Sequence, residues 1–284
     1  MSIDAQTPTR WPDGYMAARD GVQIHFVETG AGIPVLLLHG AGGSAVGSWF
    51  SNGIAPRLAE TNRAIAFDLR GYGMSGGHQH DLEAMAADTI EFMDQHGLSQ
   101  AHFAGYSMGG QVMARLMALA PGRFITASFQ GAGISETREW ARRVPKDNPG
   151  TDPDEERALA RARERRAAKG QAVGNDLFDA MERMMTRVIG RSALNATEDF
   201  VGRMMAHSTG LDLTTIKFPV MAINGEFDRP HARTHRLARE LSDFTNVILP
   251  GKGHLTAMMA GFIPDAYADE YCAFVAKHNP PAGR

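Results

Sequence analysis

Short apolar runs alternate with helix-like segments along most of the chain. Pro34–Leu38, Arg63–Phe67 and Ala101–Gly105 are nearly continuous apolar runs, as expected of strands buried on both faces of a sheet. Further strands are expected at Phe124–Phe129, Phe218–Ile223 and Asn246–Leu249, and helices at Ser48–Ala59, Leu82–Asp94, Gln111–Ala120, Ala232–Leu241 and Asp265–Lys277. This alternation predicts an α/β protein with a mainly parallel sheet and helices on both faces.

Two regions depart from this rhythm. Near the start, Gly14–Arg19 and Val22–Glu28 flank the dipeptide Asp20-Gly21, which favours a tight turn and therefore an antiparallel hairpin. With the hairpin, eight strands are expected. Residues 131–210 interrupt the alternation and are richer in charge and methionine. We therefore expect a core formed by residues 1–130 and 211–284, with residues 131–210 inserted into it as a helical cap.

Three helices are expected within the insertion. The first begins at Asp152-Pro153, where a capping residue precedes a proline at the first turn, and its many arginines indicate a solvated surface helix. Each of the other two has one apolar stripe, which could pack on the core, cover a substrate pocket, or do both. Methionine adapts well to varied apolar ligands. The methionines expected to line such a pocket are Met181, Met185, Met204 and Met205.

Composition narrows the class of partner. The 284 residues carry a net charge of −3, so no basic surplus indicates nucleic acid or an anionic membrane as a partner. The single cysteine, Cys272, excludes an internal disulfide and a multi-cysteine metal site. No apolar run is long enough to span a bilayer, and the first 20 residues lack the apolar block of a signal peptide. We therefore expect a cytoplasmic protein without membrane insertion, metal or other cofactor.

The candidate chemistry begins at Gly105-Tyr106-Ser107-Met108-Gly109. This pentapeptide places a serine between two glycines, directly after a predicted strand and directly before a predicted helix. Glycines allow the backbone to turn back sharply, so the hydroxyl of Ser107 should stand at the apex of the turn. A serine hydroxyl is a poor nucleophile unless a base lies within hydrogen-bond reach and a third group orients that base.

The ends of two later strands supply the base and the orienting acid. Asp228 follows the strand Phe218–Ile223, and His254 follows the strand Asn246–Leu249. Parallel strands bring their carboxyl ends to one edge of a sheet, so both side chains should meet Ser107 there. Glu226 is a rival acid, two residues nearer its strand, but Asp228 is the preferred partner of His254.

Acyl transfer also needs donors for the oxyanion that forms when serine attacks a carbonyl. The backbone N–H of Met108 lies at a helix start, where such groups have no helical partner. The second donor should come from the glycine-rich loop His39–Gly43, from the N–H of Ala41 or, alternatively, of Gly42. We expect His39 to brace this loop. Gly42 and Tyr106 are also expected to lie at the substrate pocket.

Together these motifs make the chain resemble the α/β-hydrolase fold superfamily, in its capped serine-hydrolase branch. The order Ser, Asp, His is the one expected of that superfamily. The resemblance implies that the motif Asp68–Ser75 holds the loop beside the site and takes no part in catalysis. A serine nucleophile argues against relatives that open epoxides or displace halide through an aspartate. The matching motifs are Leu38–Gly43, Asp68–Ser75, the Ser107 pentapeptide, Gly225–Asp228 and Gly253-His254, within residues 22–278.

The resemblance implies an esterase-like enzyme. We expect Ser107, His254 and Asp228 to cleave a small to medium apolar acyl ester, or a lactone, through an acyl-enzyme, in a monomer or homodimer. Other reactions are compatible with the same three residues: C–C bond hydrolysis, perhydrolysis, amide hydrolysis and removal of an N-terminal proline. A third class, a non-catalytic ligand-binding protein of this fold, is disfavoured because no catalytic element is missing.

Overall fold

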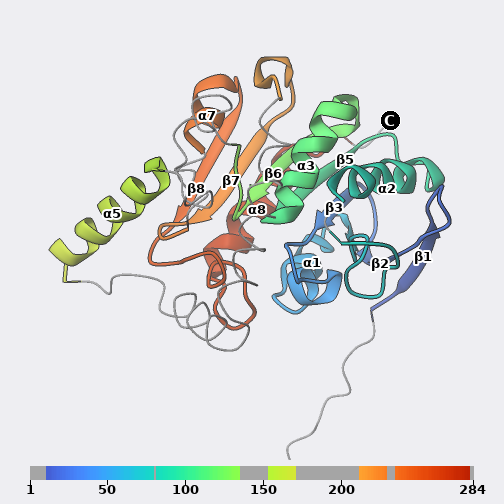
Figure 1. Cartoon of the computed structure of the whole chain (residues 1–284), viewed down its shortest axis with the longest axis horizontal. Coiled ribbons are helices and arrows are strands. Elements are labelled where there is room, and N and C mark those ends of the chain that lie inside the picture. Colours follow the sequence, from blue (N-terminus) through green and yellow to red (C-terminus); the bar gives the residue numbers. More distant parts are fainter. Residues whose placement is uncertain (1–10, 80, 135–152, 171–210, 229–233, 282–284) are drawn as a thin grey trace, which may run out of the picture.

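A computed structural model shows a central eight-stranded sheet (Figure 1), in the order β1-β2-β4-β3-β5-β6-β7-β8. It describes residues 11–79, 81–134, 153–170, 211–228 and 234–281. Strand β2 is antiparallel to β1 and β4, and all other neighbours are parallel. The expected fold class is therefore confirmed. The strands are β1 Asp13–Ala17, β2 Gln23–Gly30, β3 Pro34–Leu38, β4 Arg63–Phe67, β5 Ala101–Tyr106, β6 Phe124–Gln130, β7 Val220–Gly225 and β8 Phe244–Leu249.

Helices cover both faces of the sheet because each central strand is apolar on both sides. Along β3, Leu36 and Leu38 belong to one buried cluster, with side chains of α2, α3 and α7, whereas Val35 and Leu37 belong to the other, with α1 and α8. This alternation is the two-residue period of a strand. The helices are α1 Ile54–Leu58, α2 Leu82–Gln95, α3 Met108–Leu119, α5 Pro153–Ala168, α7 Thr234–Glu240 and α8 Asp265–Lys277, with short turns at Val46–Phe50, Pro121–Arg123 and Leu213–Thr215.

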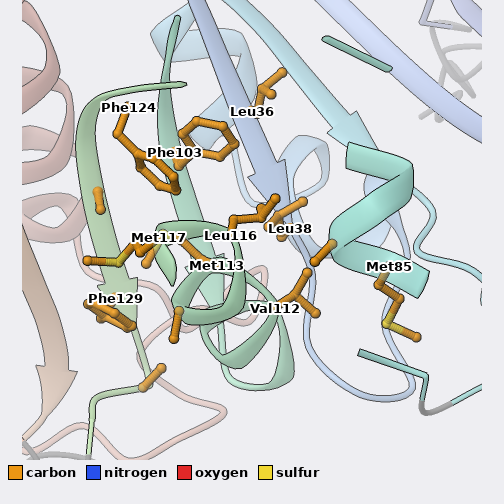
Figure 2. Close-up of a cluster of buried hydrophobic side chains, with 14 of the residues drawn as sticks. Leu36, Leu38, Met85, Phe103, Val112, Met113, Leu116, Met117, Phe124 and Phe129 are labelled. Atoms are coloured by element: carbon orange, nitrogen blue, oxygen red, sulfur yellow. The ribbon is translucent and has the colours of Figure 1, made fainter. Parts of the chain in front are cut away.

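Helix α3 is anchored on the sheet by one apolar face. Figure 2 shows Val112, Met113 and Leu116 packed toward the side chains of the neighbouring strands, among them Phe103 and Leu38, and all five are at most 1% exposed. Burying a side chain of this size stabilises the fold by about 1.5–3 kcal/mol. The start of α3, where Ser107 lies, is therefore held firmly against the ends of the central strands.

One predicted helix is wrong in detail. Instead of a single helix over Ser48–Ala59, the chain forms a short π-helical turn at Val46–Phe50 and then α1. Gly53 separates them with a φ of 84°. A left-handed residue cannot continue a right-handed helix, so the glycine ends the first element and starts the second in a new direction.

Of residues 131–210, which the sequence predicts to be an inserted cap, the structure describes residues 131–134 and 153–170. Helix α5 begins at Pro153, where the sequence predicted a helix start, and lies beside β8 in Figure 1. The methionine stripes that contain Met181, Met185, Met204 and Met205 lie outside the described residues, so they remain predictions. Among the helices that are described, none is both long and apolar enough to cross a bilayer.

Candidate active site

Ser107 stands in a strained turn between β5 and α3. Its φ of 51° makes it the only non-glycine residue with a positive φ in the described part of the chain. The turn is tight enough that a Cβ on Gly105 would collide with the backbone of Gly109, and one on Gly109 would collide with the carbonyl of Leu38. The glycines of the pentapeptide are therefore required by close backbone approach, and the hydroxyl is presented at the carboxyl edge of the sheet.

The three residues predicted from the strand ends meet at this edge. The Ser107 hydroxyl lies 3.0 Å from Nε2 of His254, and Nδ1 of the same imidazole lies 3.0 Å from Oδ2 of Asp228. The Asp228 side chain is only 2% exposed, whereas that of His254 is 24% exposed. The Asp228 carboxylate can only accept, so Nδ1–H donates to it, and Nε2 then carries the lone pair that can accept the serine proton. Ser107, His254 and Asp228 thus form a hydrogen-bonded line from solvent into the core.

Backbone hydrogen bonds join the loop that carries the acid to the loop that carries the histidine. The N–H of Glu226 donates to the carbonyl of Leu249 at 3.0 Å, and that of Phe227 donates to Lys252 at 2.9 Å. The Glu226 carboxylate accepts from the N–H of Gly251 at 3.1 Å, whereas Asp228 is the acid that contacts the imidazole. Of the two acids that the sequence offered, the geometry favours Asp228.

The loop after β3 lies directly against the serine. A Cβ on Gly40 would lie 3.1 Å from Cβ of Ser107. The N–H of Gly43 closes a turn onto the carbonyl of Gly40 at 3.0 Å, which leaves the N–H groups of Ala41 and Gly42 outside the turn bond. Both Ala41 and Gly42 are exposed. The N–H of Met108, at the start of α3, and one of these loop amides are therefore suited to hold an oxyanion.

His39 braces this loop, as the sequence predicted. Its Nδ1–H donates to the carbonyl of Gly40 at 2.7 Å, and its Nε2 accepts from the N–H of Leu69 at 3.0 Å. Burial lowers the pKa of the fully buried His39 imidazole, although the Gly40 carbonyl opposes the shift. A neutral ring with both nitrogens occupied has no capacity left to act as a base.

The motif Asp68–Ser75 holds the other end of the same loop. The Asp68 carboxylate accepts from the N–H of Ala45 at 2.7 Å and from the N–H of Met74 at 2.8 Å. It also accepts from Nδ1 of His25 at 2.8 Å. Gly73 has a φ of 53° and packs so tightly on this carboxylate that a Cβ there would collide with it. These bonds hold the loop beside the site, which agrees with the structural role expected of the motif.

Helix α5 is not the fully solvated helix that its arginines suggested. Ala162 is fully buried against Phe227, and four residues later Arg166 is only 17% exposed. The Arg166 guanidinium donates to Glu226 at 3.2 Å and lies over the ring of Phe227 at 5.6 Å. One face of the helix thus docks on the loop next to Asp228. No spacing in the sequence identifies this face, because the exposed Arg157, Arg161 and Arg165 are also four residues apart.

Tyr106 stacks on the imidazole of His254 and so lies beside the candidate base, and its place at a substrate pocket stays a prediction. Within the described ranges, no group of three or more histidine, cysteine, aspartate or glutamate side chains is arranged to hold a metal ion.

Known hydrolases resemble this chain in sequence or in fold. Bifunctional epoxide hydrolase 2 of Sus scrofa is 36% identical over 122 residues, which are 41% of this chain but only 21% of that protein. An esterase of Thermogutta terrifontis has a TM-score of 0.63 at 22% identity, with 95% of this chain and 100% of that chain covered. A meta-cleavage product hydrolase of Pseudomonas fluorescens has a TM-score of 0.63 at 18% identity, with 93% and 96% covered.

These two structures share the fold, and the pig enzyme spans far more sequence than the region it shares with this chain. The model of the alpha/beta hydrolase family matches residues 35–270, which include β3, the Ser107 turn and both loops that carry Asp228 and His254. This chain therefore belongs to the alpha/beta hydrolase family.

Proposed function

We propose that the protein is a serine hydrolase that cleaves the carboxylic ester of a small to medium apolar acyl group, or a lactone. The observation that carries this proposal is the line of hydrogen bonds from Ser107 through His254 to the buried Asp228, with spacings of 3.0 Å at each link. A serine in this arrangement is activated for attack on a carbonyl.

The chemistry follows from the positions of these groups. Nε2 of His254 takes the Ser107 proton as Oγ bonds to the ester carbonyl carbon, and Asp228 balances the charge of the imidazolium. The N–H groups of Met108 and Ala41 hold the oxyanion of the tetrahedral intermediate. The intermediate collapses as the C–O bond to the alcohol breaks and His254 returns its proton to the leaving oxygen. Water, deprotonated by His254, then releases the acid from the acyl-enzyme.

The family includes other reactions, and two features bear on them. The pig relative is named for epoxide hydrolysis, but the Ser107 nucleophile disfavours a mechanism that relies on an aspartate ester. C–C bond hydrolysis is the second candidate, because it is compatible with the same three residues; a solved meta-cleavage product hydrolase shares the fold with this chain. We expect residues 131–210 to select between ester and C–C substrates, and most of that range lies outside the described residues.

Purified protein and two variants test the proposal. We expect hydrolysis of p-nitrophenyl acetate or butyrate and covalent labelling by a fluorophosphonate. Ser107→Ala should lower kcat by at least about a thousandfold. The matched control is Ser242→Ala, an exposed serine at the opposite, amino-terminal edge of the sheet. Full activity in folded Ser107→Ala would refute the proposal, and turnover of an enol diketone without ester hydrolysis would favour the second candidate.

A further inference from the structure

Tyr106, the residue before the nucleophile, contacts the candidate base directly. Its hydroxyl donates to the backbone carbonyl of His254 at 2.9 Å. Its ring stacks on the His254 imidazole, with ring centroids 5.1 Å apart and planes 22° from parallel. The two residues are 148 positions apart in the sequence, and one side chain contacts both the ring and the backbone of the histidine.

Two glycines hold the Tyr106 ring in place. A Cβ on Gly40 would lie 2.9 Å from Cδ1 of the ring, and a Cβ on Gly131 would lie 2.8 Å from Cε2 on the opposite edge. The same Cβ on Gly131 would lie 3.2 Å from Cε1 of His254. Gly40 belongs to the candidate oxyanion loop and Gly131 follows β6, so the ring fills a slot between two loops and the imidazole.

The slot supplies a restraint that the hydrogen-bonded line lacks. Ser107 and Asp228 contact the two imidazole nitrogens, and both contacts lie along the edge of the ring. They set the ring's position in its plane, but these two bonds alone do little to oppose a tilt of the ring about the axis through them. A stacked aromatic face opposes that tilt, and the bond to the carbonyl fixes the backbone from which the ring projects.

The Tyr106 hydroxyl remains a neutral donor under assay conditions. Burial raises its pKa far above the usual value for a phenol, and the charge of Asp228 adds to the shift. A phenylalanine at this position would keep the stacking and lose only the bond to the carbonyl, so the two contributions can be separated by substitution.

We propose that Tyr106 is a positioning residue that holds the imidazole of His254 in line between Ser107 and Asp228. The inference rests on the proposed function, because it assigns His254 the role of base. Tyr106 acts through the histidine and needs no contact with substrate. Its loss should therefore lower kcat and the rate of covalent modification of Ser107, while KM stays nearly constant.

Tyr106→Phe and Tyr106→Leu test the two contributions. We measure kcat and KM with a p-nitrophenyl ester, and the second-order rate of labelling by a fluorophosphonate, both per active site titrated. Tyr106→Phe should lower both rates by up to about tenfold, the effect of one lost hydrogen bond. Tyr106→Leu should lower them by about a hundredfold, the scale of a misplaced catalytic group. Within the described residues the buried Tyr271 hydroxyl has no hydrogen-bond partner, so Tyr271→Phe is the matched control and should leave both rates unchanged.

The readouts separate positioning from folding. A merely structural role would lower the thermal midpoint and the fraction of titratable sites but not the rate per titrated site. Wild-type rates per site in folded Tyr106→Leu would overturn the proposal, as would a rise in KM at constant kcat. If the wild type is labelled but hydrolyses no ester, the ester assignment fails and the labelling rates still decide the role of Tyr106. A folded wild type that is not labelled overturns both proposals.

Discussion

His102 couples the stability of the fold to pH. The fully buried imidazole lies on β5, where Nδ1 accepts from the Thr126 hydroxyl at 2.8 Å and Nε2–H donates to Oδ1 of Asn279 at 3.0 Å. The same Asn279 oxygen accepts from Asn62 at 2.9 Å. Burial lowers the pKa of His102 to about 4 from an ordinary value of 6.5, although the bond to Asn279 opposes the shift. Through the bond to Asn279, the neutral ring connects the segment after α8 to the sheet.

The sign and size of the effect follow from this pKa. Above pH 6.5 the ring is neutral in both folded and unfolded chains, so the pH has no effect through this group. Between pH 6.5 and pH 4 His102 is protonated in the unfolded chain but stays neutral in the folded chain, so the free energy of unfolding falls as the pH is lowered. The free energy of unfolding should decrease by about 3 kcal/mol over that window, and no further below it. That is a large part of the total stability of a typical domain, about 5–15 kcal/mol.

Urea unfolding of the wild type and of His102→Gln between pH 7.5 and pH 4 measures this term. Other groups titrate equally in the two proteins, so the difference between their free energies of unfolding isolates His102. As the pH falls from 7.5 to 4, the wild type should lose about 3 kcal/mol more of its free energy of unfolding than His102→Gln does. A pH-independent difference would refute the reasoning. NMR titration of the wild type gives a second check, since a His102 ring that protonates near pH 6.5 in the folded protein would also contradict it.

Two further substitutions test contacts around the site. Arg166→Gln removes the partly buried contact with Glu226 and should lower the free energy of unfolding in urea by about 1–2 kcal/mol. Arg165 is half-exposed and lies 3.8 Å from the same carboxylate, so Arg165→Gln should leave the free energy of unfolding almost unchanged. Equal losses in the two variants would argue against a specific docking contact. Gly73→Ala forces a side chain into Asp68 at a left-handed position and should cost about 1–3 kcal/mol or more and disturb the loop before the serine. A variant as stable and as active as the wild type would contradict this.

Much of the fold could be predicted because its signals are local. The run Pro34–Leu38 became β3 with the predicted bounds, and Arg63–Phe67 became β4, since strands buried on both faces leave an unbroken apolar pattern. The helix expected over Ser48–Ala59 is instead two short helical elements, because a single left-handed Gly53 divides it. Glycine can adopt either sign of φ at little cost, so its conformation within a helical pattern is set by the packing of the neighbouring elements and not by the local sequence.

The candidate site was predictable for a related reason. Ser107, Asp228 and His254 each follow a strand, and in a parallel sheet the strand ends share one edge, so chain order alone brought them together. The contacts that surround these three residues could not be predicted from the sequence in the same way. The stacking of Tyr106 on His254 joins positions 148 residues apart, and no local pattern records such a contact.

The sequence by itself determined the order in which a serine, an aspartate and a histidine follow three strands of the sheet, and it placed glycines where backbones had to approach. These are properties of short segments, set by hydrophobic period and backbone freedom. Only the tertiary structure decided which acid faces the imidazole, which arginine of α5 docks on the Glu226 loop, and that Tyr106 fills the slot beside His254. Those outcomes depend on distances between distant segments, which the packing of helices on the sheet fixes once the whole chain has folded.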